Sequence, residues 1–89
     1  MGVPVMSAFR VSDIAHERNP TALLYHVYAG GQRRGLIAAR ARDTGSWSVA
    51  IVGVTLAQGL PSADALEDWL AAHINLGLLQ SLRPIEQEV

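Results

Sequence analysis

The sequence predicts an α+β domain: an antiparallel meander sheet of three to four strands with one C-terminal amphipathic helix packed on one face. Two observations predict this class. Between residues 22 and 54, apolar and polar residues alternate in short segments separated by Gly, Asp and Ser. After residue 62, apolar residues recur three and four positions apart. The chain of 89 residues predicts a single domain over residues 1–89, with frayed ends at 1–6 and 82–89.

The first two strands are predicted over residues 7–14 and 22–29. Apolar and polar residues alternate in the first, although a short helix starting at Ser12 is an alternative. The second segment, ALLYHVYA, is rich in aromatic and β-favouring residues and places His26 and Tyr28 on the same face.

Arginines gather in the next segment of the chain. We expect GGQRRG to form a loop, longer than a two-residue hairpin turn, that carries Arg33 and Arg34. The strand predicted over residues 36–42 places Arg40 and Arg42 on one face, because residues two apart in a strand point the same way. Such arginines are typical of a solvated sheet face, of a surface that meets an acidic protein, or of a phosphate-binding hairpin.

A further strand is predicted over residues 47–54, and the connection TLAQGLP can add a short edge strand. Ser62 is the expected N-cap of the helix, and acidic residues follow it near the positive end of the helix dipole. Gly77 is the expected residue after the C-terminus. The apolar stripe of the helix comprises Leu66, Trp69, Leu70, His73 and Ile74. We expect Trp47 and Trp69 in the core, and His73 in the core or an interface.

The composition excludes several function classes. The chain has no cysteine, which excludes disulfides, thiolate catalysis and cysteine-ligated zinc. Its formal net charge of −1 gives no general attraction to nucleic acid. The N-terminal residues lack the features of a signal peptide and no segment is long enough to span a membrane, so we expect a cytoplasmic protein.

Chemistry-bearing motifs are also missing from the sequence. The three histidines, His16, His26 and His73, lack the paired spacing of a zinc site. The acidic residues Asp64, Glu67 and Asp68 lie where carboxylates stabilise a helix N-terminus. We therefore expect no enzyme activity, no metal and no cofactor.

The segment SWSVAIVGVTLAQGLPSADALEDWLAAH, residues 46–73, is similar in layout to the strand, glycine and helix of HicB-type antitoxins. The matching positions are Gly59, Ser62, Ala65, Leu66 and Glu67, whereas the Pro-Asp-Leu-Pro-Gly stretch of that family is absent. The resemblance implies a small α+β module that binds and blocks another macromolecule.

These observations together favour a non-enzymatic protein-binding module of bacterial, plasmid or phage origin. It would act as a regulatory subunit or inhibitor by occluding a partner surface, as antitoxins and phage anti-CRISPR proteins do. We expect the contact surface to be the sheet face that the helix leaves uncovered, and homodimerisation through that face is a related expectation. The alternative is a nucleic-acid-binding protein that uses the Arg33–Arg42 hairpin. The candidate partner-binding residues are Arg33, Arg34, Arg40, Arg42, Tyr28 and His26.

Overall fold

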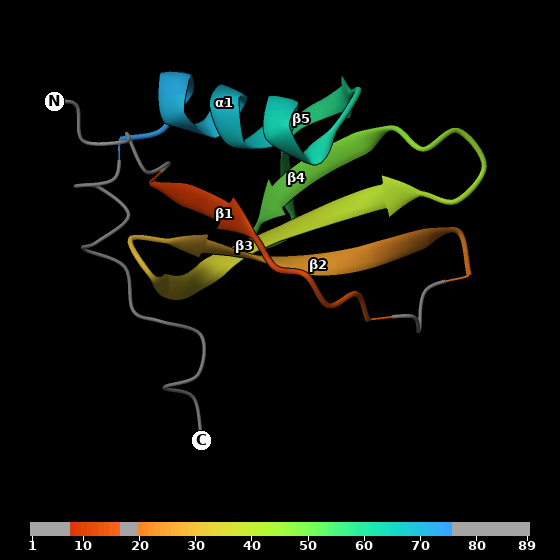
Figure 1. Cartoon of the computed structure of the whole chain (residues 1–89), viewed down its shortest axis with the longest axis horizontal. Helices are drawn as coiled ribbons and strands as arrows, with labels where there is room; N and C mark the ends of the chain where they lie inside the picture. Colours follow the sequence, from red (N-terminus) through yellow and green to blue (C-terminus); the bar gives the residue numbers. More distant parts are fainter. Residues whose placement is uncertain (1–7, 17–19, 76–89) are drawn as a thin grey trace, which may run out of the picture.

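The computed structural model describes residues 8–16 and 20–75. Within them, five strands form one antiparallel sheet in the order β1-β2-β3-β4-β5, and a single helix follows (Figure 1). The predicted α+β meander is confirmed, with five strands rather than three to four. The predicted frayed ends, 1–6 and 82–89, lie outside the described residues. The elements are β1 (Phe9–Val11), β2 (Ala22–Ala29), β3 (Gln32–Ala41), β4 (Trp47–Ile51), β5 (Val54–Leu60) and α1 (Ala63–His73).

The core lies between one face of the sheet and α1. Figure 1 shows α1 lying along β1, β4 and β5, the strands that it contacts most. Side chains alternate along a strand, so every second residue of a strand points to this face, and in β1 to β4 many of these residues are buried. The buried residues are Phe9, Val11, Val27, Ala29, Leu36, Ala38, Trp47 and Val49 from the sheet, with Leu66 and Leu70 from α1. The sheet is therefore covered by a helix on one face, as the helix stripe predicts.

The turn between β2 and β3 differs from the expected loop. Ala29 pairs directly with Gln32, so Gly30 and Gly31 alone form the turn. Their φ angles of 61° and 83° are the positive values that both central residues of a type I′ turn require, and glycine adopts them without steric cost. The prediction of a longer GGQRRG loop is wrong, and the residues assigned to it belong to β3.

The β4–β5 hairpin turns in the same way but at a non-glycine residue. Val52 has a φ of 49° and Gly53 a φ of 78°, and the flanking residues Ile51 and Val54 are paired. A β-branched residue is rarely found at positive φ, so this turn is strained. The pairing of β4 with β5 also contains two register irregularities, which bend this edge strand.

The N-terminus of α1 is capped as predicted. The Oγ of Ser62 accepts a hydrogen bond from the Ala65 N–H at 3.1 Å. The helix ends at His73, with Ile74 as its C-cap, so it is shorter than expected, and Gly77 lies outside the described residues. His73 is exposed rather than part of the core: its ring stacks on Trp69 with centroids 4.5 Å apart, and its Nδ1 donates to the Trp69 carbonyl.

The outer edge of β1, an edge strand of the sheet, is capped by a side chain of α1. The N–H of Val11 points away from β2 and donates to Oε2 of Glu67 on α1, at 2.7 Å. Beyond β1 the chain forms no helix at residues 12–16, so that alternative is wrong. Instead, His16 pairs with Leu24 in an isolated antiparallel bridge, which holds the connection against β2.

Candidate functional site

The sheet face opposite α1, here called the open face, is a candidate surface on the described part of the chain. Three strands place residues in register across it. Leu24, Ala39 and Ser48 form one row, and His26, Ile37 and Ala50 form the next. All six are partly buried, and α1, the helix of the described residues, lies on the other face. The open face is thus formed mainly by small or apolar side chains, which is unusual for a face that only meets water.

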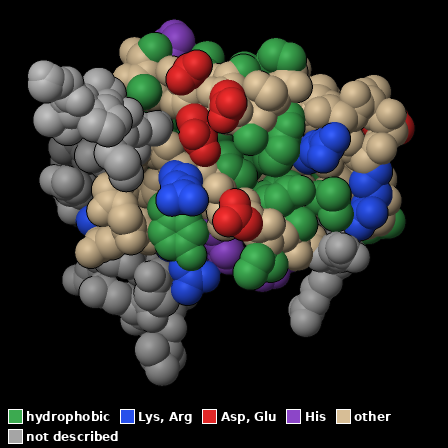
Figure 2. Space-filling model, in the orientation of Figure 1, with side chains coloured by type: hydrophobic (Ala, Val, Ile, Leu, Met, Phe, Trp, Pro, Cys, Tyr) green, Lys and Arg blue, Asp and Glu red, His purple; other side chains and the backbone are tan. Residues whose placement is uncertain are grey.

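A groove of about 770 Å³ lies at one end of the open face, beside β1. We call it the arginine groove. Arg10 of β1 is paired with Tyr28 of β2, and Tyr28 is paired with Arg33 of β3, so the two arginines flank the tyrosine across three strands. Figure 2 shows basic, histidine and hydrophobic side chains gathered where β1 and β2 lie in Figure 1. The groove is lined chiefly by Arg10, Asp13, Ile14, His16, His26, Tyr28 and Arg33.

The two histidines of the groove meet, although they are ten residues apart in the chain. The rings of His16 and His26 pack edge to face with centroids 4.9 Å apart. His26 Nε2 lies 3.2 Å from Nη1 of Arg33. Because a guanidinium only donates hydrogen bonds, His26 Nε2 is the acceptor, which assigns the ring proton to Nδ1. This contact holds the Arg33 side chain against the wall of the groove.

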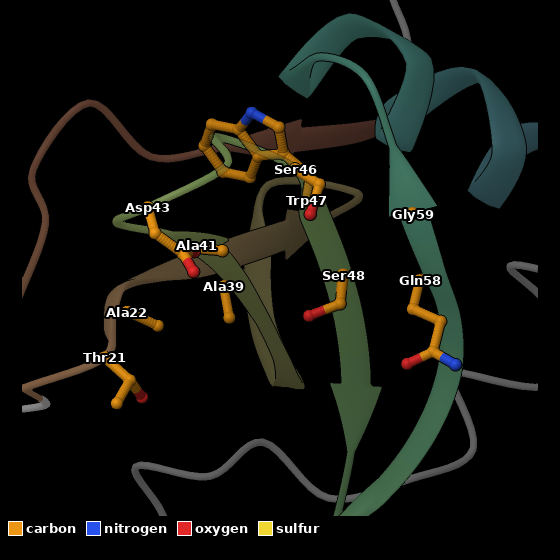
Figure 3. Close-up of a pocket in the computed structure, with 10 residues that line it drawn as sticks. All are labelled: Thr21, Ala22, Ala39, Ala41, Asp43, Ser46, Trp47, Ser48, Gln58 and Gly59. Carbon is orange, nitrogen blue, oxygen red and sulfur yellow. The ribbon is translucent and has the colours of Figure 1, made fainter.

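A second, shallower hollow of about 570 Å³ lies at the other end of the open face. Figure 3 shows the short side chains of Ala22, Ala39 and Ser48 pointing into it, whereas the Trp47 ring turns to the opposite side, toward α1. We call it the alanine hollow. Its floor is flat because small side chains leave the backbone close to the surface, and it has no charged group except Asp43 among its lining residues.

The structure divides the predicted partner-binding residues into two groups. His26, Tyr28 and Arg33 line the arginine groove together. The remaining three, Arg34, Arg40 and Arg42, do not line it.

These three arginines lie at different places. Arg34 is half-buried and alternates with Arg33 along β3. Arg40 is paired with Trp47, so it belongs to the face of the sheet that carries α1, and its guanidinium lies near Gly45. Arg42 is exposed in the turn after β3. The arginines therefore do not form one basic surface.

Two residues of the groove, Arg10 and His16, were not among the sequence candidates. Tyr28 and Arg33 could have been matched from the sequence, because a two-residue Gly-Gly turn fixes their pairing. The pairing of Arg10 with Tyr28 depends instead on a ten-residue connection between β1 and β2, whose length gives no register. The local sequence could therefore have placed Arg33 beside Tyr28, but it gave no indication that Arg10 lies on the other side of Tyr28.

No group of three or more His, Asp or Glu side chains among residues 8–16 and 20–75 is arranged to hold a metal ion. No helix in this part of the chain is long and apolar enough to cross a membrane. The arginine groove places two arginine side chains, those of Arg10 and Arg33, beside the ring of Tyr28.

Comparison of the chain with protein-family models, curated proteins and solved structures finds no significant match. The resemblance of residues 46–73 to HicB-type antitoxins is therefore one of local layout. In the structure these residues form the whole of β4, the bulged strand β5 with Gly59 at a φ of 73°, and α1 with its Ser62 cap.

Proposed function

We propose that this protein is a non-catalytic binding module that docks on a protein partner through its open face. It acts as a regulatory subunit or inhibitor by covering a surface that the partner needs, within the cytoplasm of a bacterium or of a cell infected by a phage. The observation that carries this proposal is the composition of the open face. Four apolar residues on this face are only partly buried, and the described helix lies on the other face of the sheet. They are Leu24, Ile37, Ala39 and Ala50.

The two ends of the open face suit a protein surface. The alanine hollow is a flat, apolar area onto which another backbone can pack closely. The arginine groove adds tyrosine and arginine, the residue types that most often supply binding energy at interfaces. A patch of this kind combines an apolar centre with a charged end and so favours one orientation of the partner.

A protein partner is favoured over nucleic acid by the distribution of charge. The alternative proposal relied on Arg33 to Arg42 acting as one hairpin surface. Arg33 lines the open face, whereas Arg40 shares the opposite face with Trp47. Two cations on opposite faces of a sheet cannot track one phosphate backbone, so counterion release from this hairpin is small.

The proposal is tested by affinity capture with two matched double variants. Ala39→Glu with Ala50→Glu adds two negative charges to the open face, and Ala71→Glu with Ala72→Glu adds the same charge to the exposed side of α1. We expect wild type and the α1 variant to capture the same protein in stoichiometric amount, and the open-face variant to fail to capture it. Circular dichroism checks that each variant is folded, and Ser48→Glu serves as a milder change if the double variant unfolds.

Two results would contradict the proposal. One is capture of the same protein by the folded open-face variant with undiminished yield. The other is sedimentation of wild type as a dimer and of the open-face variant as a monomer, with no other protein captured, because the occupant of the face is then a second copy of this chain.

A further inference from the structure

The arginine groove brings two guanidinium groups, one phenol ring and two imidazoles to a single hollow. We propose that it binds a short acidic peptide segment of the partner, with a carboxylate held by Arg10 and Arg33 and an adjacent apolar side chain packed on Tyr28 and Ile14. This inference rests on the proposed function, since it assigns one chemical feature of the partner to one end of the open face.

The spacing of the two arginines suits carboxylates. Arg10 and Arg33 are each paired with Tyr28, on the strands to either side of it. Neighbouring strands lie about 4.8 Å apart, so the two Cα atoms are separated by about 10 Å and the long side chains can converge over the ring. Each guanidinium presents a planar set of N–H donors that matches the two oxygens of a carboxylate. The row can therefore hold one carboxylate between both arginines or two consecutive ones.

Arg33 is held in place before any ligand arrives. Its Nη1 donates to Nε2 of His26 at 3.2 Å, and the His26 ring is packed against His16. A guanidinium carries five N–H donors, and this contact uses one of them. Because the side chain is already fixed, less conformational entropy is lost on binding, and the affinity for a ligand is higher. This gain matters most for a short ligand, which makes few other contacts.

The groove also has an apolar side. Ile14 is 74% exposed at its rim, one of the most exposed large apolar side chains of the described residues. The aromatic side chain of Tyr28 also lines the groove. An isolated carboxylate would leave these groups in water, so the ligand that fits best carries Leu, Ile or an aromatic residue next to its acidic one.

The size and charge of the arginine groove favour a short peptide over a long polyanion. The groove volume of about 770 Å³ lies within the range of about 300–1,000 Å³ typical of small-ligand sites. Asp13 also lines the groove, so the positive charge along it is interrupted and not continuous. Binding of a nucleic-acid strand requires a continuous basic path, which Arg40 on the other face does not extend.

The test measures binding of two capped peptides that differ only in charge, Glu-Glu-Leu-Glu-Glu and Gln-Gln-Leu-Gln-Gln. Backbone and arginine Nε–H signals of isotope-labelled protein are followed by NMR during titration. We expect the acidic peptide to shift the signals of Arg10, Tyr28 and Arg33, and the neutral peptide to leave them unchanged.

Matched variants separate the groove from total charge. Arg10→Gln with Arg33→Gln removes two positive charges in the groove, and Arg40→Gln with Arg42→Gln removes two elsewhere. The Arg10→Gln, Arg33→Gln variant should bind the acidic peptide about tenfold more weakly, or weaker still, because it loses charge-assisted hydrogen bonds. The Arg40→Gln, Arg42→Gln variant keeps these bonds, so its affinity should fall by less than about twofold. Thermal unfolding verifies that both pairs are folded.

Three results would overturn the proposal. The first is an equal loss of affinity in both variant pairs, which indicates a general charge effect. The second is tighter binding of a fifteen-nucleotide oligothymidine than of the acidic peptide, with the same dependence on Arg10 and Arg33. The third is capture of the partner by the Arg10→Gln, Arg33→Gln variant at wild-type yield when the open-face glutamate variant fails. In that last case the proposed function stands and the groove proposal does not.

Discussion

The contact between Glu67 and β1 gives the sharpest stability prediction. The Glu67 carboxylate accepts a hydrogen bond from the Val11 N–H at 2.7 Å, in a partly buried position where α1 meets the sheet edge. Replacing Glu67 by Ala leaves this N–H without its acceptor at a site that α1 shields from water. A hydrogen bond to a charged group contributes roughly 1.5–3 kcal/mol, so the free energy of unfolding should fall by about that amount.

Urea unfolding followed by tryptophan fluorescence measures the change. A small domain loses about 1 kcal/mol of stability per molar urea, so the unfolding midpoint of the Glu67→Ala variant should fall by about 1.5–3 M. Glu67→Gln keeps a neutral acceptor and should lose about half as much. Asp68→Ala is the matched control: Asp68 is the adjacent acidic residue and is exposed, so its loss should change stability by less than about 0.5 kcal/mol.

Amide hydrogen exchange identifies the cause of the effect. If Glu67 acts through β1, the Val11 amide should exchange faster in Glu67→Ala than the measured change in global stability explains, since the strand edge opens locally. An unchanged Val11 exchange rate, or a midpoint shift equal to that of Asp68→Ala, would refute the assigned role of this contact.

Three further stability predictions concern turns and caps, each checked by urea unfolding. Val52→Asn should stabilise the protein by about 1 kcal/mol, because Val52 is 85% exposed and has a φ of 49°, and Asn-Gly suits a type I′ turn; an unchanged or lower midpoint contradicts strain at this turn. Gly31→Ala should cost about 1–2 kcal/mol through its φ of 83° alone, since an added Cβ meets nothing within 4 Å, and Gly31→Asn should cost less. Ser62→Ala should cost about 1 kcal/mol and Ser62→Asp almost nothing, because aspartate also caps the Ala65 N–H; equal losses in both would exclude capping as the cause.

Local patterns in the sequence were sufficient to predict the helix, whose backbone hydrogen bonds are internal, and the strands in which apolar and polar residues alternate regularly. The Ser62 cap and the apolar spacing located α1, and alternation located β2. The strands predicted over 36–42 and 47–54 were found with different bounds: β3 already begins at Gln32, and β4 ends at Ile51, before the Val52–Gly53 turn. His73 lies at an apolar position of the helix pattern, but it is exposed and stacks on Trp69, whereas the next residue, Ile74, packs against the core. Periodicity therefore predicted the apolar side of the helix, but not which residue at the edge of that side is buried.

The site was harder to predict because it depends on register between strands. Arg33 and Arg40 are both on β3 and are separated by an odd number of positions, so they belong to opposite faces. Assigning Arg33 to a loop hid this difference. Arg10 is placed at the groove by the pairing of β1 with β2, and His16 by its isolated bridge to Leu24; neither pairing has a local signal in the sequence.

The two margins of the sheet are protected by different means. At β1 an incoming strand would have to displace the Glu67 carboxylate from Val11, and at β5 the irregular pairing with β4 leaves no straight ladder to copy. Lateral growth into a longer sheet, the usual route to fibrils in small β-rich chains, is therefore disfavoured at both sides. The apolar open face thus lies between two edges that discourage strand addition, which suits the proposed docking of a single partner on that face.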